Sequence, residues 1–296
     1  MTGVLLIDKP EGLTSFGALI RVKKIINQKK CGHTGTLDPM ATGVLTVMLG
    51  SATRFCELLP DHDKAYTATV RLGLETDTLD ITGKVLRESP VTATRQDVEK
   101  ALEGFRGRIS QLPPMYSAVS VNGQRLYELA RKGEEVERTP REVEITELTL
   151  LGCDEAKGEY TLHIACSAGT YIRTLADDLG KKLGCGAVLT ALRRTKANGH
   201  TVEKALTLEE LREAAENGTL EQHLMTVEQA MESYPAVTVT AAQAKRFANG
   251  GELMLSRVGG AEQPGYYRVK GPDGTFLGLG ENNGGENLLV KRVYRS

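Results

Sequence analysis

The chain has 296 residues, a formal net charge of −1, 40% hydrophobic residues and 25% charged residues. These values are ordinary for a globular protein with room for one large domain and one small one. No segment approaches the run of about 20 apolar residues that a membrane-spanning helix needs, and the short apolar start does not resemble a secretory signal. We therefore expect a cytoplasmic protein that begins with a β-strand and has no membrane segment.

The residue patterns give no indication of a metal or of a nucleotide cofactor. The five cysteines are odd in number and none lies in a C-x-x-C pair, which argues against a disulfide framework or a zinc knuckle. The histidines form no H-E-x-x-H pattern, no Walker A motif is present, and the glycines between 278 and 284 miss the spacing of a dinucleotide loop. We therefore expect neither a cofactor nor a metal site.

The net charge alone argues against a nucleic-acid partner, but the basic residues are unevenly placed. They form three clusters: Lys23, Lys24, Lys29 and Lys30; Arg125, Arg131, Lys132, Arg138 and Arg141; and Lys181, Lys182, Arg193, Arg194 and Lys196. A mostly acidic stretch from 203 to 232 cancels them. A protein can combine a basic face with a near-neutral total. The clusters are compatible with an RNA-binding face and equally with ordinary solvated helix faces.

The N-terminal part of the chain contains a predicted helix followed by a predicted loop. Residues 15 to 27 have apolar residues at helical spacing, which predicts an amphipathic helix. Its apolar stripe consists of Phe16, Leu19, Ile20 and Ile26. Residues 31 to 43 contain three glycines, three threonines and a proline, and are therefore expected to form a loop. This loop leads into an apolar segment, 44 to 49.

The middle of the chain alternates between predicted strands and helices. Residues 64–72, 143–151 and 160–166 alternate or carry strand-forming residues, and 115–121 is a predicted short strand that ends at an Asn122-Gly123 turn. Helices are predicted from Thr94, as N-cap, to Phe105, from about Thr170 to Leu183 with Gly184 as its end, and from the capping box at 207–210.

A boundary is expected near residue 234, because the remaining chain consists of short strands, one small helix and many glycines. It has the size of a small β-rich module near the lower limit for independent folding. Strands and helices in mixed order predict the α+β class, with a long, mixed and mostly antiparallel sheet, rather than a doubly wound parallel sheet.

The segment from Cys31 to Leu45 is the most unusual in the chain. Its glycines permit tight turns, Pro39 favours an extended conformation at Asp38, and the segment leads into the core. A carboxylate and an imidazole, those of Asp38 and His33, therefore lie on a constrained loop, where catalytic groups are often found. On the residues alone, the simpler explanation of Asp38 is favoured: a helix N-cap with Pro39 in the first helical position.

This segment resembles the signature of the TruB family of tRNA pseudouridine-55 synthases, and further motifs of that family follow in its order from residue 8 to 194. They are Asp8-Lys9-Pro10, Gly32-His33-Thr34-Gly35-Thr36-Leu37-Asp38-Pro39, Lys64-Ala65-Tyr66, Thr76-Asp77-Thr78-Leu79-Asp80, Pro113-Pro114 with Tyr116-Ser117-Ala118, Gly169-Thr170-Tyr171-Ile172-Arg173, and Leu192-Arg193-Arg194. The tail resembles a PUA module more loosely.

The resemblance implies roles for individual residues. Asp38 would be the catalytic aspartate, Arg173 its partner, and Tyr66 a base-stacking residue with a part in proton transfer. His33, Tyr171 and Leu192 would line the uridine pocket or hold the flipped nucleotide. Residues that would support the site or contact RNA are Lys9, Lys64, Asp80, Arg131, Lys132, Arg193 and Arg194.

The implied reaction is the isomerisation of uridine 55, in the TΨC loop of tRNA, to pseudouridine. It breaks the C1′–N1 bond and forms C1′–C5 without a redox change, so no cofactor is needed. An ionised carboxylate can attack the substrate or stabilise positive charge at C1′, and an arginine keeps it charged when it is buried.

The implied organisation is a pseudouridine synthase domain, 1–232, and a PUA-like module, 234–296. A mobile segment at about 120–142 would close over the tRNA T-arm, with Arg131, Lys132, Arg138 and Arg141 as candidate phosphate contacts. A monomer without an obligatory protein partner is expected. Three alternatives stay open: a magnesium site at Asp77 and Asp80, a non-enzymatic RNA-binding protein, and an enzyme of a guide-RNA particle.

Overall fold

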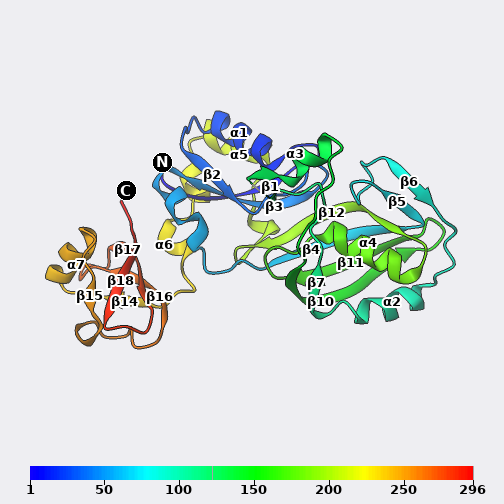
Figure 1. Ribbon diagram of the computed structural model, residues 1–296. Coiled ribbons are helices and arrows are strands. Elements are labelled where there is room, and N and C mark those ends of the chain that lie inside the picture. Colours follow the sequence, from blue (N-terminus) through cyan, green and yellow to red (C-terminus); the bar gives the residue numbers. More distant parts are fainter. Residues whose placement is uncertain (122, 296) are drawn as a thin grey trace.

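The computed structural model describes residues 1–121 and 123–295, and its dominant element is a long mixed sheet (Figure 1). In spatial order the sheet contains β1 (Gly3–Lys9), β3 (Thr42–Leu49), β12 (Ala187–Ala197), β4 (Lys64–Leu72), β11 (Glu159–Cys166), β10 (Arg141–Asp154) and β7 (Gly107–Gln111). β2 (Cys31–Thr34) pairs with β3, and β13 (His200–Thr201) pairs with β12. Among the described residues, the β3–β12 pair is parallel and the other pairs of this sheet are antiparallel.

Helices cover the two ends of this sheet. α1 (Ser15–Ile25) and α5 (Leu208–Glu216) pack together near β1 and β2, whereas α2 (Arg95–Glu103) and α4 (Ile172–Leu183) pack over β10 and β12 (Figure 1). The predicted caps are confirmed: Thr94 and Thr207 form capping boxes, and Gly184 ends α4 with a left-handed φ of 79°. The cluster of buried side chains beneath α2 and α4 includes Val70, Leu162 and Leu179.

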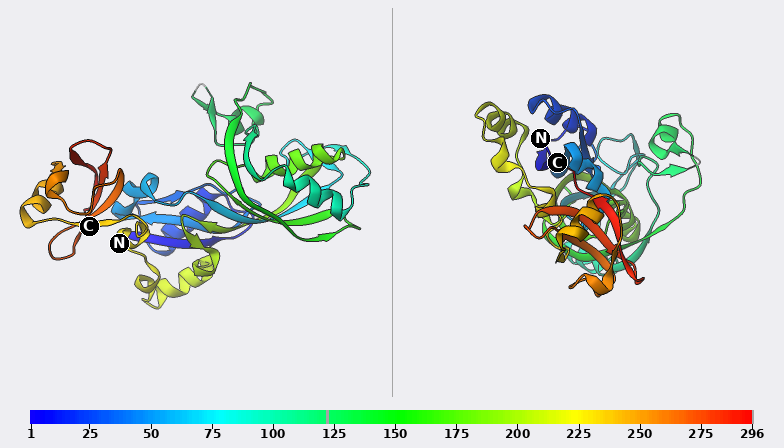
Figure 2. Two further views of the ribbon diagram at one scale, coloured as in Figure 1. Left: turned by 90° about the horizontal axis from the view of Figure 1, so that it is seen from below. Right: turned by 90° about the vertical axis from the view of Figure 1, so that its left-hand side faces the viewer.

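The remaining elements are short. They are β5 (Leu74–Thr76), β6 (Val85–Glu88), β8 (Ser120–Val121), β9 (Gln124–Arg125), α3 (Leu126–Arg131), α6 (Val227–Ala230), and the 3₁₀ helices η1 (Gly50–Leu58), η2 (Val202–Lys204), η3 (Leu220–His223) and η4 (Leu255–Arg257). Figure 2 shows the segment that carries α3 standing out from the sheet.

The C-terminal part forms its own sheet, in the order β14 (Ala236–Thr238), β16 (Gly265–Lys270), β17 (Phe276–Asn282), β18 (Asn287–Val293) and β15 (Leu253–Met254), with α7 (Ala241–Ala248) beside it. It shares apolar contacts with the first part, because Phe276 and Leu279 belong to the same buried cluster as Phe55 and Met48. The expected α+β class, with a mostly antiparallel sheet and a β-rich C-terminal module, is confirmed.

Three local predictions were wrong, and one strand was missed. Residues 31–34 form a strand instead of a loop, because pairing with β3 outweighs their weak local preference. The strand expected at 115–121 is limited to Ser120–Val121, since a turn bond joins the Ser117 N–H to the Met115 carbonyl. β12 was not predicted. The stripe on α1 was placed one residue off: Phe16 is 61% exposed. The stripe that packs inward is Ser15, Ala18, Leu19 and Val22. Asn122, of the predicted turn, lies outside the described residues.

Gly43 permits the close approach of β3 and β12. It pairs with Arg194 in the parallel ladder, its φ is +104°, and a Cβ there would lie 2.2 Å from the Arg194 carbonyl oxygen. We expect Gly43→Ala to lower the free energy of unfolding by about 3 kcal/mol or more, since the backbones must separate. Gly12→Ala is the matched control, because Gly12 also has a positive φ but no atom within 4 Å of such a Cβ, and strain alone costs about 1 kcal/mol. Equal losses for the two variants in urea unfolding would contradict this account.

Candidate active site

A cavity of about 260 Å³ opens where β4, β12, the β2–β3 loop and the start of α4 meet. It brings together six of the residues singled out in the sequence: Asp38, Lys64, Tyr66, Tyr171, Arg173 and Leu192. Ser117 and Ala118, from the segment that leads to α3, complete one wall. Residues from widely separated parts of the chain therefore form one concave site.

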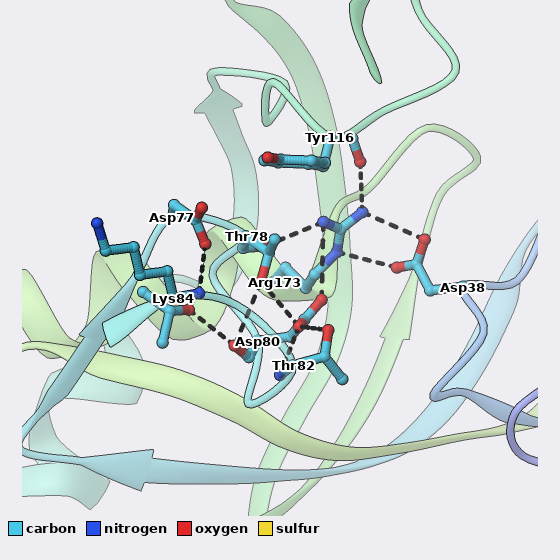
Figure 3. A network of polar contacts seen from close by, with 9 residues as sticks. Asp38, Asp77, Thr78, Asp80, Thr82, Lys84, Tyr116 and Arg173 are labelled. Atoms are coloured by element: carbon cyan, nitrogen blue, oxygen red, sulfur yellow. Dashed lines mark hydrogen bonds and ion pairs between the residues drawn. The ribbon is translucent and has the colours of Figure 1, made fainter. Parts of the chain in front are cut away.

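Arg173 is the centre of the polar network in this cavity (Figure 3). Its guanidinium contacts both oxygens of Asp38: Nε lies 2.9 Å from Oδ2, and Nη2 donates to Oδ1 at 3.2 Å. It also donates to the carbonyl oxygens of Thr78, at 3.0 Å, and Tyr116, at 2.8 Å. The expected pairing of Asp38 with Arg173 is present in a bidentate form, and it fixes the orientation of the carboxylate.

Asp80 supports this network from below. Its Oδ2 lies 3.9 Å from Arg173 Nη1, while Oδ1 accepts hydrogen bonds from both the hydroxyl of Thr78 and the hydroxyl and backbone N–H of Thr82. Asp77 accepts from the backbone N–H of Lys84. The carboxylates of the 76–84 turn are thus engaged by protein donors, which is the arrangement of a hydrogen-bonded turn rather than that of a magnesium site.

Two anchors hold Asp38 in place from the N-terminal side. The Ser15 hydroxyl bonds both the N–H and the carbonyl of Leu37, at 2.7 and 3.1 Å. The ammonium of Lys9, which is fully buried, donates to the carbonyls of Pro10, Leu13 and Pro39. No helix starts after Asp38, since residues 39–40 form a turn and β3 begins at Thr42, so the N-cap interpretation does not apply.

Burial of Asp38 disfavours its ionised form, and the positive charge of Arg173 offsets part of this effect. Burial raises the pKa of Asp38 above its ordinary value of 3.8, and the charge of Arg173 acts in the opposite direction. The side chain keeps 35% of its surface accessible, on the side of the cavity. A carboxylate that is desolvated but held charged by one arginine is suited to act on an electrophilic carbon or on a positive charge.

Tyr66 and Leu192, on the adjacent strands β4 and β12, form the back of the cavity. Tyr66 is 5% exposed, and burial raises its pKa to about 12. Leu192 is 8% exposed and supplies an apolar wall. An aromatic face and an apolar wall suit a nucleobase that has left its stack.

Gln111 is a site residue that the sequence patterns did not predict, and Ser117, part of the Tyr116-Ser117-Ala118 motif, was given no role there. Gln111 clamps the main chain of Tyr171: its Oε1 accepts from the Tyr171 N–H at 2.9 Å, and its Nε2 donates to the Tyr171 carbonyl at 3.3 Å. In the sequence, both residues lie close to the Pro113-Pro114 motif. Only the fold places Gln111 against the main chain of Tyr171 and Ser117 in the wall of the cavity.

The other residues singled out in the sequence do not line the cavity. His33 lies on β2, and the buried Lys9 supports the β2–β3 loop by donating to the Pro39 carbonyl. Arg193 forms a bidentate pair with Asp8 at 2.7 and 3.0 Å. Arg194 is fully buried, so the expected third basic cluster is not wholly a surface feature. Arg131 and Lys132 are exposed at the end of α3.

Comparison with protein families gives matches along nearly the whole chain. Residues 23–172 match the model of the TruB family pseudouridylate synthase, N-terminal domain, residues 173–232 the tRNA pseudouridylate synthase B C-terminal domain, and residues 235–294 the C-terminal model of pseudouridine synthase II TruB. The chain belongs to the TruB family. It is therefore an isomerase of the pseudouridine synthase type.

Individual relatives agree with this assignment. The chain is 44% identical over 299 residues to the tRNA pseudouridine synthase B of Pseudomonas fluorescens, a match that covers 100% of this chain and 96% of that protein. It is 44% identical over 303 residues to the protein of the same name from Escherichia coli O1:K1, with 99% and 95% covered. Among solved structures, a Cbf5-Nop10-Gar1 complex contains a chain that matches with a TM-score of 0.76 and 25% identity, over 99% of this chain and 84% of that one.

Within residues 1–121 and 123–295, no helix of this TruB-family chain is long and apolar enough to cross a membrane.

Proposed function

We propose that this enzyme isomerises the uridine at position 55, in the TΨC loop of tRNA, to pseudouridine, with Asp38 as the essential carboxylate. The observation that carries the proposal is the Asp38–Arg173 pair at the mouth of a nucleobase-sized cavity walled by Tyr66 and Leu192. The relatives, named tRNA pseudouridine synthase B, support tRNA as the substrate.

In the proposed mechanism, the target uridine leaves its stack and enters the cavity against Tyr66. Asp38 acts on the ribose or the base while the C1′–N1 bond breaks, the uracil rotates, and C1′–C5 forms. Loss of the C5 proton then restores the aromatic system of the uracil, and Tyr66 or a water takes part in that transfer. The cost of unstacking, a few kcal/mol, is offset by contacts of the base with Tyr66 and Leu192.

The proposal is tested by mapping the product on an unmodified tRNA transcript. Carbodiimide modification followed by primer extension should stop at position 55 and at no other uridine. An isolated T-arm stem-loop, incubated with the purified chain alone, should be modified too. Modification that needs a guide RNA or an added protein would favour the guide-RNA type of enzyme, and binding without any product would favour the non-enzymatic alternative.

We further propose that the chain acts as a monomer and grips the tRNA with two elements. The C-terminal module, 234–296, would be a PUA-like contact with the acceptor stem, while the segment at about 120–142 closes over the T-arm. Ser117 and Ala118 line the cavity directly before this segment, and Arg131 and Lys132 are exposed on it, which supports a role for this segment in binding RNA.

Reversing the charge of Arg131 and Lys132 should weaken tRNA binding and flatten its salt dependence. Each phosphate contact releases counterions, so the slope of log K against log salt should become shallower by about 1 for every phosphate that the variant no longer binds. The double variant Lys100→Glu and Lys157→Glu is the matched control, since it makes the same change in net charge on α2 and in the β10–β11 turn, outside the segment at about 120–142. If filter binding gives the same slope of log K against log salt for the two double variants, α3 does not contact the tRNA.

A further inference from the structure

Arg194 is a buried cation for which the catalytic proposal has no role so far. Its side chain is fully buried on β12, and its Nε donates to the Val44 carbonyl at 2.8 Å. Within the described residues, neither Nη1 nor Nη2 has a hydrogen-bond partner. An arginine buried without full satisfaction costs stability, and burial lowers the pKa of Arg194 accordingly.

The group that favours the charged form of Arg194 is the hydroxyl of Tyr66. The two residues are direct partners in the β12–β4 register, so their side chains lie on the same face of the sheet. The contact falls short of a well-formed hydrogen bond, because both terminal nitrogens still lack a partner at bonding geometry among the residues that the structure describes. The Arg194 guanidinium thus lies next to Tyr66, and the N–H groups of its two terminal nitrogens are available as donors.

Arg194 also lies directly behind the wall of the active cavity. A Cβ on Gly35, which lines the cavity, would be 3.2 Å from Arg194 Nη1. The guanidinium itself has no contact with solvent. It therefore reaches the substrate through Tyr66, which is both its neighbour and a lining residue.

The charged groups around the pair leave Tyr66 as the site of a compensating negative charge. The charge of Arg194 lowers the pKa of Lys9 of β1, His33 of β2 and Lys64 of β4, while Cys166 of β11 and Asp38 of the β2–β3 loop act on the pKa of Tyr66. Those facing Arg194 are basic. Asp38, the carboxylate of this set, is bound by Arg173.

We propose that Arg194 is a positioning residue that acts through Tyr66: its free N–H groups engage the phenolic oxygen, turn the O–H toward the base in the cavity, and stabilise the phenolate that forms when this proton passes to N1 of the rotated uracil and before the phenolate takes the C5 proton. A guanidinium has donors only, so the phenolic oxygen must accept from it, and the hydroxyl hydrogen is left for the substrate. Burial, and to a smaller extent Cys166 and Asp38, raise the pKa of Tyr66, whereas the charge of Arg194 lowers it. The inference rests on the proposed function, in which Tyr66 contacts the flipped uracil.

The direct test is a titration of the phenol at position 66. With 3,5-difluorotyrosine in place of Tyr66, the hydroxyl ionises in a range where the protein stays folded, and ¹⁹F NMR reports it. Arg194→Met should raise the pKa of this phenol by at least about 1 unit, and Arg194→Lys by less. Lys196→Met is the matched control on the same strand; Lys196 is 44% exposed and pairs with Asp61, so it should leave the phenol unchanged. An unchanged phenol in Arg194→Met overturns the proposal.

A second measurement separates positioning from a structural role. Because Arg194→Met removes an incompletely satisfied buried charge, the variant should unfold at the same or a higher urea concentration. When the substrate is tRNA labelled with [5-³H]uridine, the single-turnover rate at which the variant releases tritium should nevertheless fall by about tenfold or more. Its dissociation constant for tRNA should be unchanged. Loss of stability in both Arg194→Met and Arg194→Lys, with an unshifted phenol, would make Arg194 a structural residue.

These measurements also distinguish the inference from the proposed function. The phenol titration needs neither RNA nor turnover, so it can fail while the wild-type enzyme modifies tRNA. Conversely, absence of tritium release by the wild type would contradict the proposed function whatever the titration shows.

Discussion

Asp38→Asn should abolish pseudouridine formation while leaving tRNA binding intact. The amide keeps the shape of the carboxylate but removes the negative charge that the reaction needs, and its single acceptor oxygen can keep only one of the two contacts with Arg173. We expect the rate of tritium release from tRNA labelled with [5-³H]uridine to fall by at least about a thousandfold. Each product formed frees one C5 hydrogen, so the signal reports the isomerisation itself.

Asp178→Asn is the matched control for this substitution. Burial raises the pKa of Asp178 as it does that of Asp38, but Asp178 does not line the active cavity, so its variant should keep the wild-type rate. A loss of rate in both variants would indicate a general effect of neutralising buried carboxylates. Turnover by Asp38→Asn at a wild-type rate would remove Asp38 from the mechanism.

The pH dependence of the rate and that of the folding stability both follow from the ionisation of Asp38. Because the pKa of Asp38 in the folded protein is raised, the enzyme should lose activity as pH falls through a value above 3.8. The change of folding stability with rising pH has the opposite sign to the change that a salt-bridged carboxylate with a lowered pKa would give. The folded state binds this proton more tightly than the unfolded chain, so the contribution of Asp38 to stability falls as pH rises from its unfolded pKa, and the full cost is present above its folded pKa.

Substitution of Arg173 should have the second large effect, on both rate and stability. Arg173→Met leaves Asp38 and Asp80 facing each other without their shared cation, and it strands the carbonyls of Thr78 and Tyr116. We expect a loss of about 3–5 kcal/mol in the free energy of unfolding, because a broken buried ion pair leaves uncompensated charge. The pKa of Asp38 should rise further, which moves the acidic limb of the rate profile to higher pH.

Arg173→Lys separates charge from geometry. Lysine keeps the cation but cannot bind both oxygens of Asp38 and two carbonyls at once, so stability should recover more than the rate, which should stay about a hundredfold below wild type. Lys181→Met on the same helix is the control, because Lys181 is 67% exposed and its pair with Asp177 is worth about 0.3–0.5 kcal/mol. Equal stability losses for Lys181→Met and Arg173→Met in urea unfolding would contradict the network's role.

Local signals in the sequence were sufficient for many of the elements. Thr94 and Thr207 mark helix starts because a capping box is formed by residues three positions apart. The alternation at 64–72 predicts β4, since side chains of a strand point to opposite faces along a single segment. The order of the motifs around Asp38, Tyr66 and Arg173 likewise predicted the family and its reaction type.

Tertiary contacts decided what those signals left open. The strand at 31–34 exists because β3 offers it a partner, and the inward face of α1 was set one residue away from the stripe that includes Phe16 by what packs against it.

The sequence by itself therefore determined the caps, the β4 alternation and the family with its candidate carboxylate, because each of these depends on neighbours a few residues apart or on an ordered set of motifs. Only the tertiary structure decided how Asp80 contacts Arg173, that Gln111 holds the main chain of Tyr171, and that Arg194, which the sequence grouped with surface charges, is fully buried beside Tyr66. The physical reason is that burial, desolvation and pairing across strands depend on contacts between segments far apart in the chain, such as the 135 residues that separate Asp38 from Arg173.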